Sequence, residues 1–374
     1  MKTGLSVVVP TYGRVDLLEN LLISIQTDAN QIDIPIEIIL VDDSIEIEYS
    51  RIKILATKYD ARVLTGVTHV GGKRNLGAKE AIYEYVLFLD SDVMIRGGTL
   101  QAHSDSLNSG NEEPIGCLGQ VIFVGESTLA WEVVSEMQLT LPFSYPLVSK
   151  TVPWGPTANM SFKKEVFFSV GGFDTTLPQY GGEDVDLGLR LTRSSHEIVT
   201  NKYAVAEHTI ETWSTWKQNF KRLWYFGRAD YYLMLRHSDR VFFDFPTFPM
   251  LWILQILTSA MIVTIRGIEN SLLLLIGLIC SVVIYHFTYG LIKKQLESKL
   301  WVHLLGPIIF IIMDLAKIWE SAKHRKFKLM FCRVKFLDNL ISQDWKEIVA
   351  SAWGLTASAL FYFGIVLLYL SRTK

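Results

Sequence analysis

The sequence has little of several features that mark large classes of protein. Its 374 residues include only three cysteines, Cys117, Cys280 and Cys332, and these are far apart. Cysteines with this spacing exclude a disulfide framework and do not match the ligand spacing of a zinc site. Positive and negative side chains almost cancel, leaving a formal net charge of −2. The total charge therefore gives no indication of nucleic-acid binding.

Two further signals are missing from the start of the chain. The opening stretch MKTGLSVVVPTYGR has too short an apolar core for a signal peptide. We therefore expect the N-terminal half to stay in the cytosol, where it is made. The first apolar run ends in PTYGR instead of the glycine pattern G-x-G-x-x-G. This argues against a dinucleotide-binding dehydrogenase.

Hydropathy divides the chain into two parts. Residues 1–240 have the composition of a water-soluble domain, whereas residues 241–374 contain long uncharged apolar runs. We predict membrane spans near residues 248–265, 271–292 and 348–370. Each run is long enough for a helix to cross a hydrocarbon core of ~30 Å.

The segment 300–319 is harder to assign. It contains Gly306-Pro307. The basic stretch that follows, residues 317–336, has seven Lys or Arg and one Glu. Short basic segments stay on the cytosolic side of a membrane, and a spanning helix here would place this one outside. We therefore expect a re-entrant or interfacial segment, followed by an amphipathic stretch on anionic lipid. A fourth span is the alternative.

The soluble part alternates strand and helix patterns. Apolar runs at residues 5–9, 36–41 and 85–89 predict buried strands, and residues 17–25 and 74–85 have helical patterns. Strands that alternate with helices predict an α/β fold with parallel strands. In such sheets the ligand binds at the carboxyl ends of the strands.

Carboxylates follow two of the predicted strands. Asp42, in VDDS, can accept hydrogen bonds from a ribose hydroxyl or a base N–H, or it can form an Asx turn. Asp90 and Asp92, in DSD, follow the strand at residues 85–89. Mg²⁺ and Mn²⁺ bind to one or two carboxylates together with phosphate oxygens of a substrate. The DSD sequence therefore predicts a divalent metal site, with a solvated turn as the alternative.

The stretch THVGGKRNLG predicts an anion site. Its Gly71-Gly72 pair lets the backbone approach a ligand, and Lys73 and Arg74 add cations at a helix start. The unpaired N–H groups of a helix start also favour anions. A diphosphate would fit such a site. The alternative is an ordinary basic helix start in solvent.

A fourth pattern, GGFDTTLPQYGGEDVDLGLRL, combines glycines with acidic residues. Glycines at 171–172 and 181–182 flank a loop, and Glu183 and Asp184 then open a helix. A helix N-terminus lowers the pKa of a carboxyl group, which suits a base that must be ionised. Helix capping by Asp184 is the alternative.

Taken in order, SVVVPTYGR, VDDS, GGKRNLG, DSD, GGFD…GGEDVDLGLRL and AEH resemble family 2 glycosyltransferases of the GT-A fold, over about residues 4–235. The resemblance implies a Rossmann-like α/β domain followed by an all-α membrane region. It also implies an inverting, metal-dependent hexosyltransferase that uses Mg²⁺ or Mn²⁺ and a nucleotide-sugar donor, with a UDP-sugar expected.

The resemblance also implies roles for single residues. Asp184 would be the catalytic base, with Glu183 beside it. His208, in AEH, matches a position that in some relatives helps to hold metal or diphosphate; a structural histidine is the alternative. The other implied contacts are Pro10, Tyr12 and Asp42 with the nucleoside, Lys73 and Arg74 with uracil or diphosphate, Asp90 with metal and donor, Asp92 with metal, and Trp154 and Asn159 with the donor or acceptor pocket.

A catalytic base indicates the kind of acceptor. A hydroxyl must lose a proton when it attacks, whereas a polyprenyl phosphate oxygen is already ionised. We therefore expect transfer to a lipid-linked saccharide or a growing surface glycan, in polysaccharide or glycolipid biosynthesis. The enzyme would be a multi-pass protein of the cell membrane that contacts lipids but no nucleic acid. A polyprenyl-phosphate glycosyltransferase and a membrane-anchored nucleotidyltransferase are the alternatives.

Overall fold

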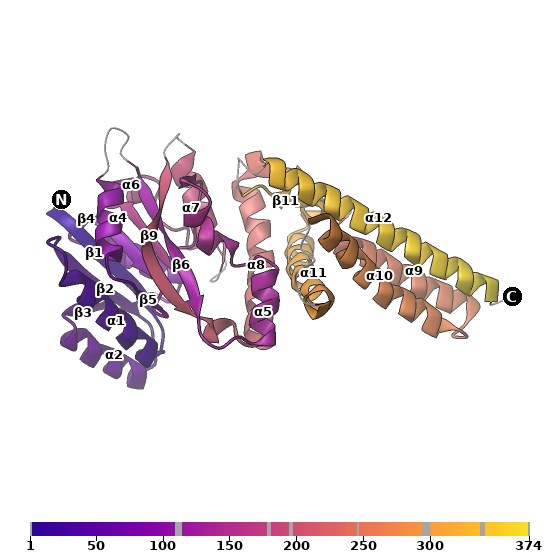
Figure 1. Ribbon diagram of the computed structural model, residues 1–374, viewed down its shortest axis with the longest axis horizontal. Helices are drawn as coiled ribbons and strands as arrows, with labels where there is room; N and C mark the ends of the chain where they lie inside the picture. The colour runs from indigo at the N-terminus through magenta and orange to yellow at the C-terminus, as the bar shows by residue number, and fades with distance from the viewer. Residues whose placement is uncertain are drawn as a thin grey trace. The chain divides into compact units, whose positions relative to one another are not determined.

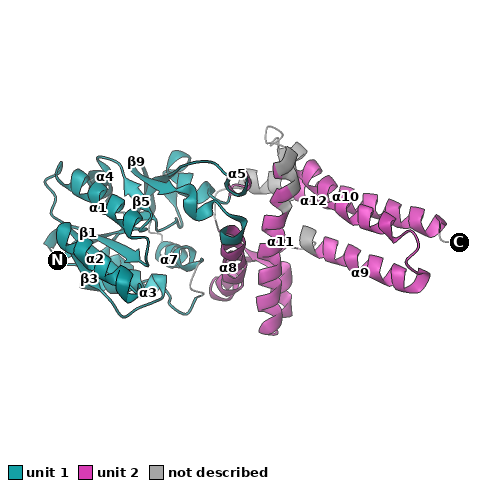
Figure 2. Cartoon of the chain, turned by 90° about the horizontal axis from the view of Figure 1, so that it is seen from below, with its two compact units in different colours: residues 1–131, 139–218 teal, residues 132–138, 219–374 magenta. Residues whose placement is uncertain are grey.

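The computed structural model describes residues 2–108, 114–177, 181–193, 197–244, 247–293, 300–336 and 341–372. They form two compact units, which Figure 2 distinguishes by colour. Unit 1 contains residues 1–131 and 139–218, and unit 2 contains residues 132–138 and 219–374. Residue 240, the predicted domain boundary, lies within unit 2.

One mixed sheet forms the centre of unit 1 (Figure 1). Its strand order is β3-β2-β1-β4-β8-β6-β9-β5, and β7 pairs with β9. The first four strands of this order are parallel to one another, and β8 runs antiparallel to both β4 and β6. The strands are β1 (Lys2–Thr11), β2 (Ile36–Asp42), β3 (Ala61–Leu64), β4 (Tyr83–Leu89), β5 (Val93–Ile95), β6 (Gly116–Val124), β7 (Thr151–Val152), β8 (Asn159–Lys163) and β9 (Ile198–Thr209).

Helices cover this sheet and bury its apolar side chains. On α1, Leu18, Leu22 and Ile25 recur at helical spacing and have no exposed surface. They pack in one core with Val7, Leu40 and other apolar side chains of the central strands. The helices of this part of the chain are α1 (Val15–Ala29), α2 (Glu46–Lys58), α3 (Val70–Glu80), α4 (Thr99–Leu107), α5 (Leu129–Glu136), α6 (Lys164–Ser169) and α7 (Glu183–Thr192), with 3₁₀ turns at Leu141–Leu147 and Ile210–Trp213.

The parallel start of the sheet confirms the α/β prediction. Thr11, at the end of β1, lies opposite Asp42, at the end of β2. One predicted boundary is wrong: the helix expected at residues 74–85 is α3, which begins at Val70 and ends at Glu80. Its predicted last residues belong to β4, because pairing with β1 holds that segment extended.

Unit 2 is mainly helical, as predicted, and it also contains a small antiparallel pair of strands that was not predicted. Figure 2 shows α11 running crosswise to α10 and α12, which lie along one another. The elements of this unit are α8 (Trp216–Arg236), α9 (Phe248–Arg266), α10 (Ser271–Lys293), α11 (Leu300–Lys323) and α12 (Ile341–Arg372), the strands β10 (Val241–Phe243) and β11 (Cys332–Val334), and 3₁₀ turns at Ser238–Arg240 and Phe327–Phe331.

Two helices of the described chain are long and apolar enough to cross a membrane: Ser271–Tyr289 in α10 and Trp353–Arg372 in α12. The apolar part of α9, Met250–Arg266, is shorter. Hydrogen bonds nevertheless tie α9 to both of the others. The Tyr362 hydroxyl donates to the carbonyl oxygen of Gln255 at 2.7 Å, and the Ser281 hydroxyl donates to its Oε1 at 2.8 Å. Polar bonds of this kind hold helices together where apolar burial gives no driving force.

Candidate active site

The ends of β1 and β2 form one polar edge of the sheet. Asp42 is fully buried, and its Oδ1 accepts hydrogen bonds from the Thr11 and Ser44 hydroxyls, each at 2.6 Å. Its Oδ2 accepts from the Ser44 N–H at 3.0 Å. Asp42 therefore forms the Asx turn that the sequence analysis gave as the alternative. Both of its carboxylate oxygens accept hydrogen bonds from Thr11 or Ser44.

Lys73 links α3 to this edge. Its ammonium donates to the Thr11 carbonyl oxygen at 2.6 Å, forms an ion pair with Asp43 and lies 5.9 Å from the centre of the Tyr12 ring. Lys73 is buried, whereas 61% of Tyr12 is exposed. The edge thus presents an open aromatic ring above a buried, paired cation. Pro10 is buried within β1, opposite Val41.

Arg74 joins two acidic groups that are far apart in the sequence. One guanidinium nitrogen is 2.8 Å from Asp90 Oδ1 and another is 3.1 Å from Glu183 Oε1. The Arg74 side chain is only 5% exposed, and its Nε has no hydrogen-bond partner among the described residues. A buried guanidinium with charged partners on two sides fixes the distance between them. The carboxyl end of β4 is therefore held close to the start of α7.

The glycine pair before Lys73 serves packing within the protein. A Cβ added to Gly71 would lie 2.9 Å from Phe173 Cβ, and one added to Gly72 would lie 2.6 Å from Val67 Cγ1. Side chains of the protein already fill these spaces. Close approach of a ligand to the backbone of these two glycines stays a prediction.

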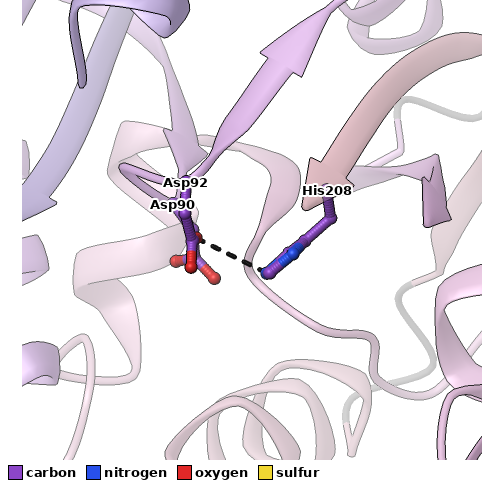
Figure 3. Close-up of side chains that lie close together, drawn as sticks. All are labelled: Asp90, Asp92 and His208. Atoms are coloured by element: carbon purple, nitrogen blue, oxygen red, sulfur yellow. Dashed lines mark ion pairs between the residues drawn. The ribbon is translucent and has the colours of Figure 1, made fainter. Parts of the chain in front are cut away.

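Three groups that can bind a metal meet beyond the end of β4. One ligand atom each from Asp90, Asp92 and His208 lies within 4.8 Å of the other two. Figure 3 shows the two carboxylates and the imidazole pointing toward the same space. Strand pairing brings them together, because Val93 at the start of β5 lies opposite His208 on β9. Two ligands on opposite sides of an Mg²⁺ ion are ~4.2 Å apart, twice the ~2.1 Å bond length, so small side-chain movements would place all three on one ion.

The hydrogen bonding of His208 fits this role. Its Nδ1 is 2.8 Å from the carbonyl oxygen of Thr209, so Nδ1 must carry the proton that is donated. In the neutral ring Nε2 then holds a lone pair, and this atom lies 3.4 Å from Asp92 Oδ1. A lone pair facing a carboxylate is favourable only with a cation or a proton between them. Donation from the second ring nitrogen to a carbonyl is also the usual arrangement for a metal-binding histidine.

Arg14 was missed by the sequence analysis. Its Nη1 lies 2.6 Å from Asp92 Oδ2, and its side chain is 49% exposed. The backbone of Arg14 has a φ of 51°, a left-handed conformation that is uncommon for residues other than glycine. The only sequence signal was the final letter of PTYGR, and a basic residue after a turn is common in any protein. Arg14 therefore neutralises one of the carboxylates of the candidate metal site.

Glycines and a second arginine position α7. Gly171, Gly172, Gly181 and Gly182 all have positive φ angles, between 69° and 90°, which other residues rarely adopt. Arg190 donates to the carbonyl oxygens of Val170 and Gly172, both at 2.7 Å. The predicted glycine-flanked loop is confirmed at both ends, and it delivers Glu183 and Asp184 to the first turn of α7.

The environment of Asp184 reverses the predicted direction of its pKa. Removal of water by the surrounding protein, together with the negative charge of Glu183, raises the pKa of Asp184 to about 7. A hydrogen bond from the Val185 N–H and the charge of Arg74 act in the opposite direction but are weaker. The prediction that the helix N-terminus lowers this pKa is therefore wrong. A carboxyl group with this pKa is a stronger base than an ordinary aspartate and remains largely ionised slightly above neutral pH.

Trp154 and Asn159 were both predicted to line a pocket. Asn159 is fully buried, its Oδ1 lies 2.9 Å from His103 Nε2, and its amide donates to the carbonyl oxygens of Gln120 and Ala204. It is a buried residue of the sheet, and its assignment to a pocket stays a prediction. Trp154 packs against α7, where a Cβ added to Gly188 would lie 2.5 Å from Trp154 Cβ.

The mixed sheet, with acidic, basic and imidazole groups at one edge, is a GT-A-like arrangement. Comparison with known proteins agrees. Residues 6–173 match the model of glycosyl transferase family 2, and residues 143–212 match a model described as the N-terminal domain of galactosyltransferase. The chain carries a family 2 glycosyltransferase domain.

Two curated relatives match part of the chain. The pre-mycofactocin glycosyltransferase of Mycobacterium tuberculosis is 28% identical over 169 residues, covering 45% of this chain and 35% of the relative. The chondroitin synthase of Pasteurella multocida is 24% identical over 229 residues, covering 50% of this chain and 23% of the relative. The chain therefore spans about a third or less of the length of these relatives.

A solved structure supports the fold. A mannosyltransferase from Pyrobaculum calidifontis, solved in complex with GDP-Man and Mn²⁺, matches with a TM-score of 0.51 and 16% sequence identity. The match covers 86% of this chain and 88% of that chain. At this identity the likeness concerns the fold.

Proposed function

We propose that the protein transfers a sugar, with inversion at the anomeric carbon, from a nucleoside-diphosphate sugar to a hydroxyl group. The observation that carries the proposal is the bridge made by Arg74 between Asp90 and Glu183. It holds a candidate metal and diphosphate site next to a carboxyl group, Asp184, whose pKa is raised to about 7. A displacement requires departure of the diphosphate and deprotonation of the acceptor. The groups proposed for these two events lie close together.

The proposed step is a single displacement. The acceptor oxygen forms a bond to the anomeric carbon while the bond to the donor phosphate oxygen breaks. Asp184 takes the proton of the acceptor hydroxyl, and the departing nucleoside diphosphate keeps the electron pair. Lys73, Arg74 and Arg14 lie at the same edge, where their positive charges oppose the charge that develops on the diphosphate. Holding donor and acceptor in line contributes much of the remaining acceleration.

Asp90, Asp92 and His208 are the residues that would hold a divalent ion. Their ligand atoms and the tautomer of His208 fit such an ion. When bound, it would supply positive charge to the diphosphate oxygens. The remaining work falls to the side chains of this chain, which orient the donor and receive the proton.

The donor and acceptor can be tested together. The sequence motifs support a UDP-sugar, and the GDP-Man bound by the Pyrobaculum relative makes GDP-mannose the competing donor. A panel of UDP- and GDP-sugars with Mn²⁺ should release nucleoside diphosphate for one donor class when a saccharide acceptor is added. Release that requires a polyprenyl phosphate instead would overturn the hydroxyl acceptor. In a separate assay that offers a nucleoside triphosphate and a sugar phosphate in place of the nucleotide sugar, release of pyrophosphate would identify a nucleotidyltransferase.

The apolar helices of unit 2 support a membrane-anchored enzyme with a lipid-linked or surface-glycan acceptor. We propose that α9, α10 and α12 cross the membrane and that the catalytic domain lies in the cytosol. With α9 leaving and α10 returning, the basic segment after α11 stays on the cytosolic side, in accord with the positive-inside rule.

The pH dependence of kcat/KM should report the unusual pKa of Asp184. Below about pH 7 its carboxyl group becomes protonated, so kcat/KM should fall about tenfold for each further pH unit. In Glu183→Gln the negative charge that raises the pKa of Asp184 is absent, and the acidic limb should move to lower pH. The measurement is the pH profile of both proteins at saturating metal. A limb that stays in place would show that Asp184 is not the titrating group.

Arg14→Gln should strengthen metal binding to the enzyme without donor. Arg14 competes with a cation for Asp92, and a half-exposed ion pair is worth about 0.2–1 kcal/mol. We therefore expect the Kd for Mn²⁺ to fall by a factor of a few, measured by titration calorimetry. Arg51→Gln, which removes an exposed partner of Asp16, is the matched control. Weaker metal binding in Arg14→Gln would show instead that Arg14 holds Asp92 in its binding orientation.

A further inference from the structure

The second half of α11 has its polar and apolar faces reversed. Its inward residues Asp314, Lys317 and Glu320 are 4%, 1% and 0% exposed. The outward residues Leu315 and Trp319 are 39% and 60% exposed. A helix on the surface of a water-soluble protein has the opposite arrangement, with its apolar stripe facing the core. The outer face of α11 is therefore built to meet an environment other than bulk water.

The inward charges are paired, which fixes the orientation of the helix. Lys317 Nζ lies 3.2 Å from Asp314 Oδ1, and Arg333, on β11, lies 3.2 Å from Asp314 Oδ2. Arg228, on α8, lies 2.7 Å from Glu320 Oε1. Breaking a buried pair of this kind leaves an uncompensated charge. Rotation of α11 to hide Trp319 would break all of these pairs, so the exposed stripe is a fixed feature of unit 2.

The exposed stripe continues into a basic loop. Leu315, Trp319 and Lys323 follow at four-residue spacing and therefore lie on one face. Residues 324–328, which follow directly, are all exposed, and among them Phe327 is 59% exposed. Residues 323–336 contain no acidic residue. The surface thus passes from a leucine, through a tryptophan, to a cluster of cations with a second aromatic ring.

We propose that this stripe and the loop 323–328 form a membrane-interface surface that binds anionic lipid headgroups. The proposal rests on the membrane anchoring proposed above, because α11 runs crosswise to α10 and α12 (Figure 2). Helices crossing the bilayer would place α11 parallel to its plane. Tryptophan is enriched at the level of the headgroups, and basic clusters next to a span attract the anionic cytosolic leaflet. The cations of the surface are Lys323, Arg325, Lys326 and Lys328.

The depth of α11 in a bilayer tests this proposal. The full-length protein, with its three cysteines replaced by serine, receives one environment-sensitive fluorophore through Trp319→Cys or Leu315→Cys. It is reconstituted into nanodiscs of phosphatidylcholine with an equal part of phosphatidylglycerol. We expect a blue-shifted emission at both positions, quenched by lipids labelled near the headgroup more strongly than by lipids labelled near the bilayer centre. Equal, shallow depths indicate a helix that lies in the interface.

Two outcomes contradict the interface. Strong quenching from the bilayer centre at one of the two positions shows a spanning helix, and no quenching at either shows water or a second copy of the chain on this face. The same label at Ile276→Cys, on an exposed position of α10, separates the two proposals. Quenching at 276 without quenching at 319 overturns the interface alone, whereas no quenching at 276 overturns the membrane anchoring itself.

The lipid charge is tested separately. Replacing Arg325, Lys326 and Lys328 with glutamine should abolish the extra headgroup-level quenching at position 319 that phosphatidylglycerol adds over phosphatidylcholine alone. Lys53→Gln with Lys202→Gln removes exposed cations of unit 1 and should leave that difference unchanged. An equal response to the two lipids in the unaltered loop would contradict binding to anionic headgroups.

Discussion

Asp92→Ala is expected to weaken Mn²⁺-dependent binding of the nucleotide by at least about 10–100-fold, the loss typical even for residues that only support a metal ligand. Asp92 is 8% exposed and lies between Arg14 and His208, with one carboxylate oxygen directed at each. Without it, the remaining groups are Asp90, which is also paired with Arg74, and a single imidazole. The measurement is calorimetric titration with nucleoside diphosphate, in the presence and absence of Mn²⁺.

The comparison between the two titrations is decisive. Binding without Mn²⁺ should change much less than binding with it, because the substitution does not alter Tyr12 or the β1 edge, where we expect the nucleoside contacts. Asp16→Ala removes an exposed carboxylate near the start of α1 and serves as the control for net charge. An unchanged affinity with Mn²⁺ in Asp92→Ala would reject the assignment of Asp92 as a metal ligand.

The sequence was sufficient to predict the part of the fold that positions these groups. Short apolar runs ending in VDDS and DSD predicted parallel strands with carboxylates at one edge. Pairing of β1 with β2 and β4 confirmed that arrangement. Such runs are informative because a buried parallel strand must be apolar on both faces. The polar residues that follow such a run therefore mark the end of the strand.

Pairings that depend on strand register could not be predicted. His208 reaches Asp92 only because β9 runs antiparallel to β5 with Val93 opposite His208, and no local pattern encodes that alignment. The same holds for Asn159, whose amide is used by His103 and by backbone carbonyl groups of two other strands. A residue type suited to a pocket is equally suited to a buried network, and only the fold distinguishes the two.

The direction of a pKa shift was the second property that the sequence did not predict correctly. A helix N-terminus favours a charged carboxylate, and this effect alone predicted a lowered pKa for Asp184. Crowding by protein and the adjacent Glu183 outweigh it, because desolvation acts on the full charge of the carboxylate. The hydropathy of α11 was also insufficient as a guide. It does not show that the charged residues of this helix face inward and that Trp319 faces outward.

Asp184→Asn should lower turnover by about 10²–10⁴-fold, the usual contribution of a general base. Asparagine has nearly the same shape as aspartate, and its Oδ1 can still accept the hydrogen bond from the Val185 N–H, which is 2.8 Å from Asp184 Oδ1. The start of α7 should therefore be preserved. What is lost is the ability to receive a proton from the acceptor. The measurement is a single-turnover rate with saturating donor and metal, alongside the Kd for the donor.

The donor Kd separates loss of the base from damage to the site. Since the groups assigned to donor and metal lie on other elements, Asp184→Asn should bind the donor about as well as the native protein. Asp105→Asn, at an exposed position of α4, is the matched control for the amide substitution. Turnover equal to that of the native protein would reject Asp184 as the base. It would also remove the main argument for a hydroxyl acceptor, because an acceptor that is already ionised, such as a polyprenyl phosphate, needs no group to take its proton.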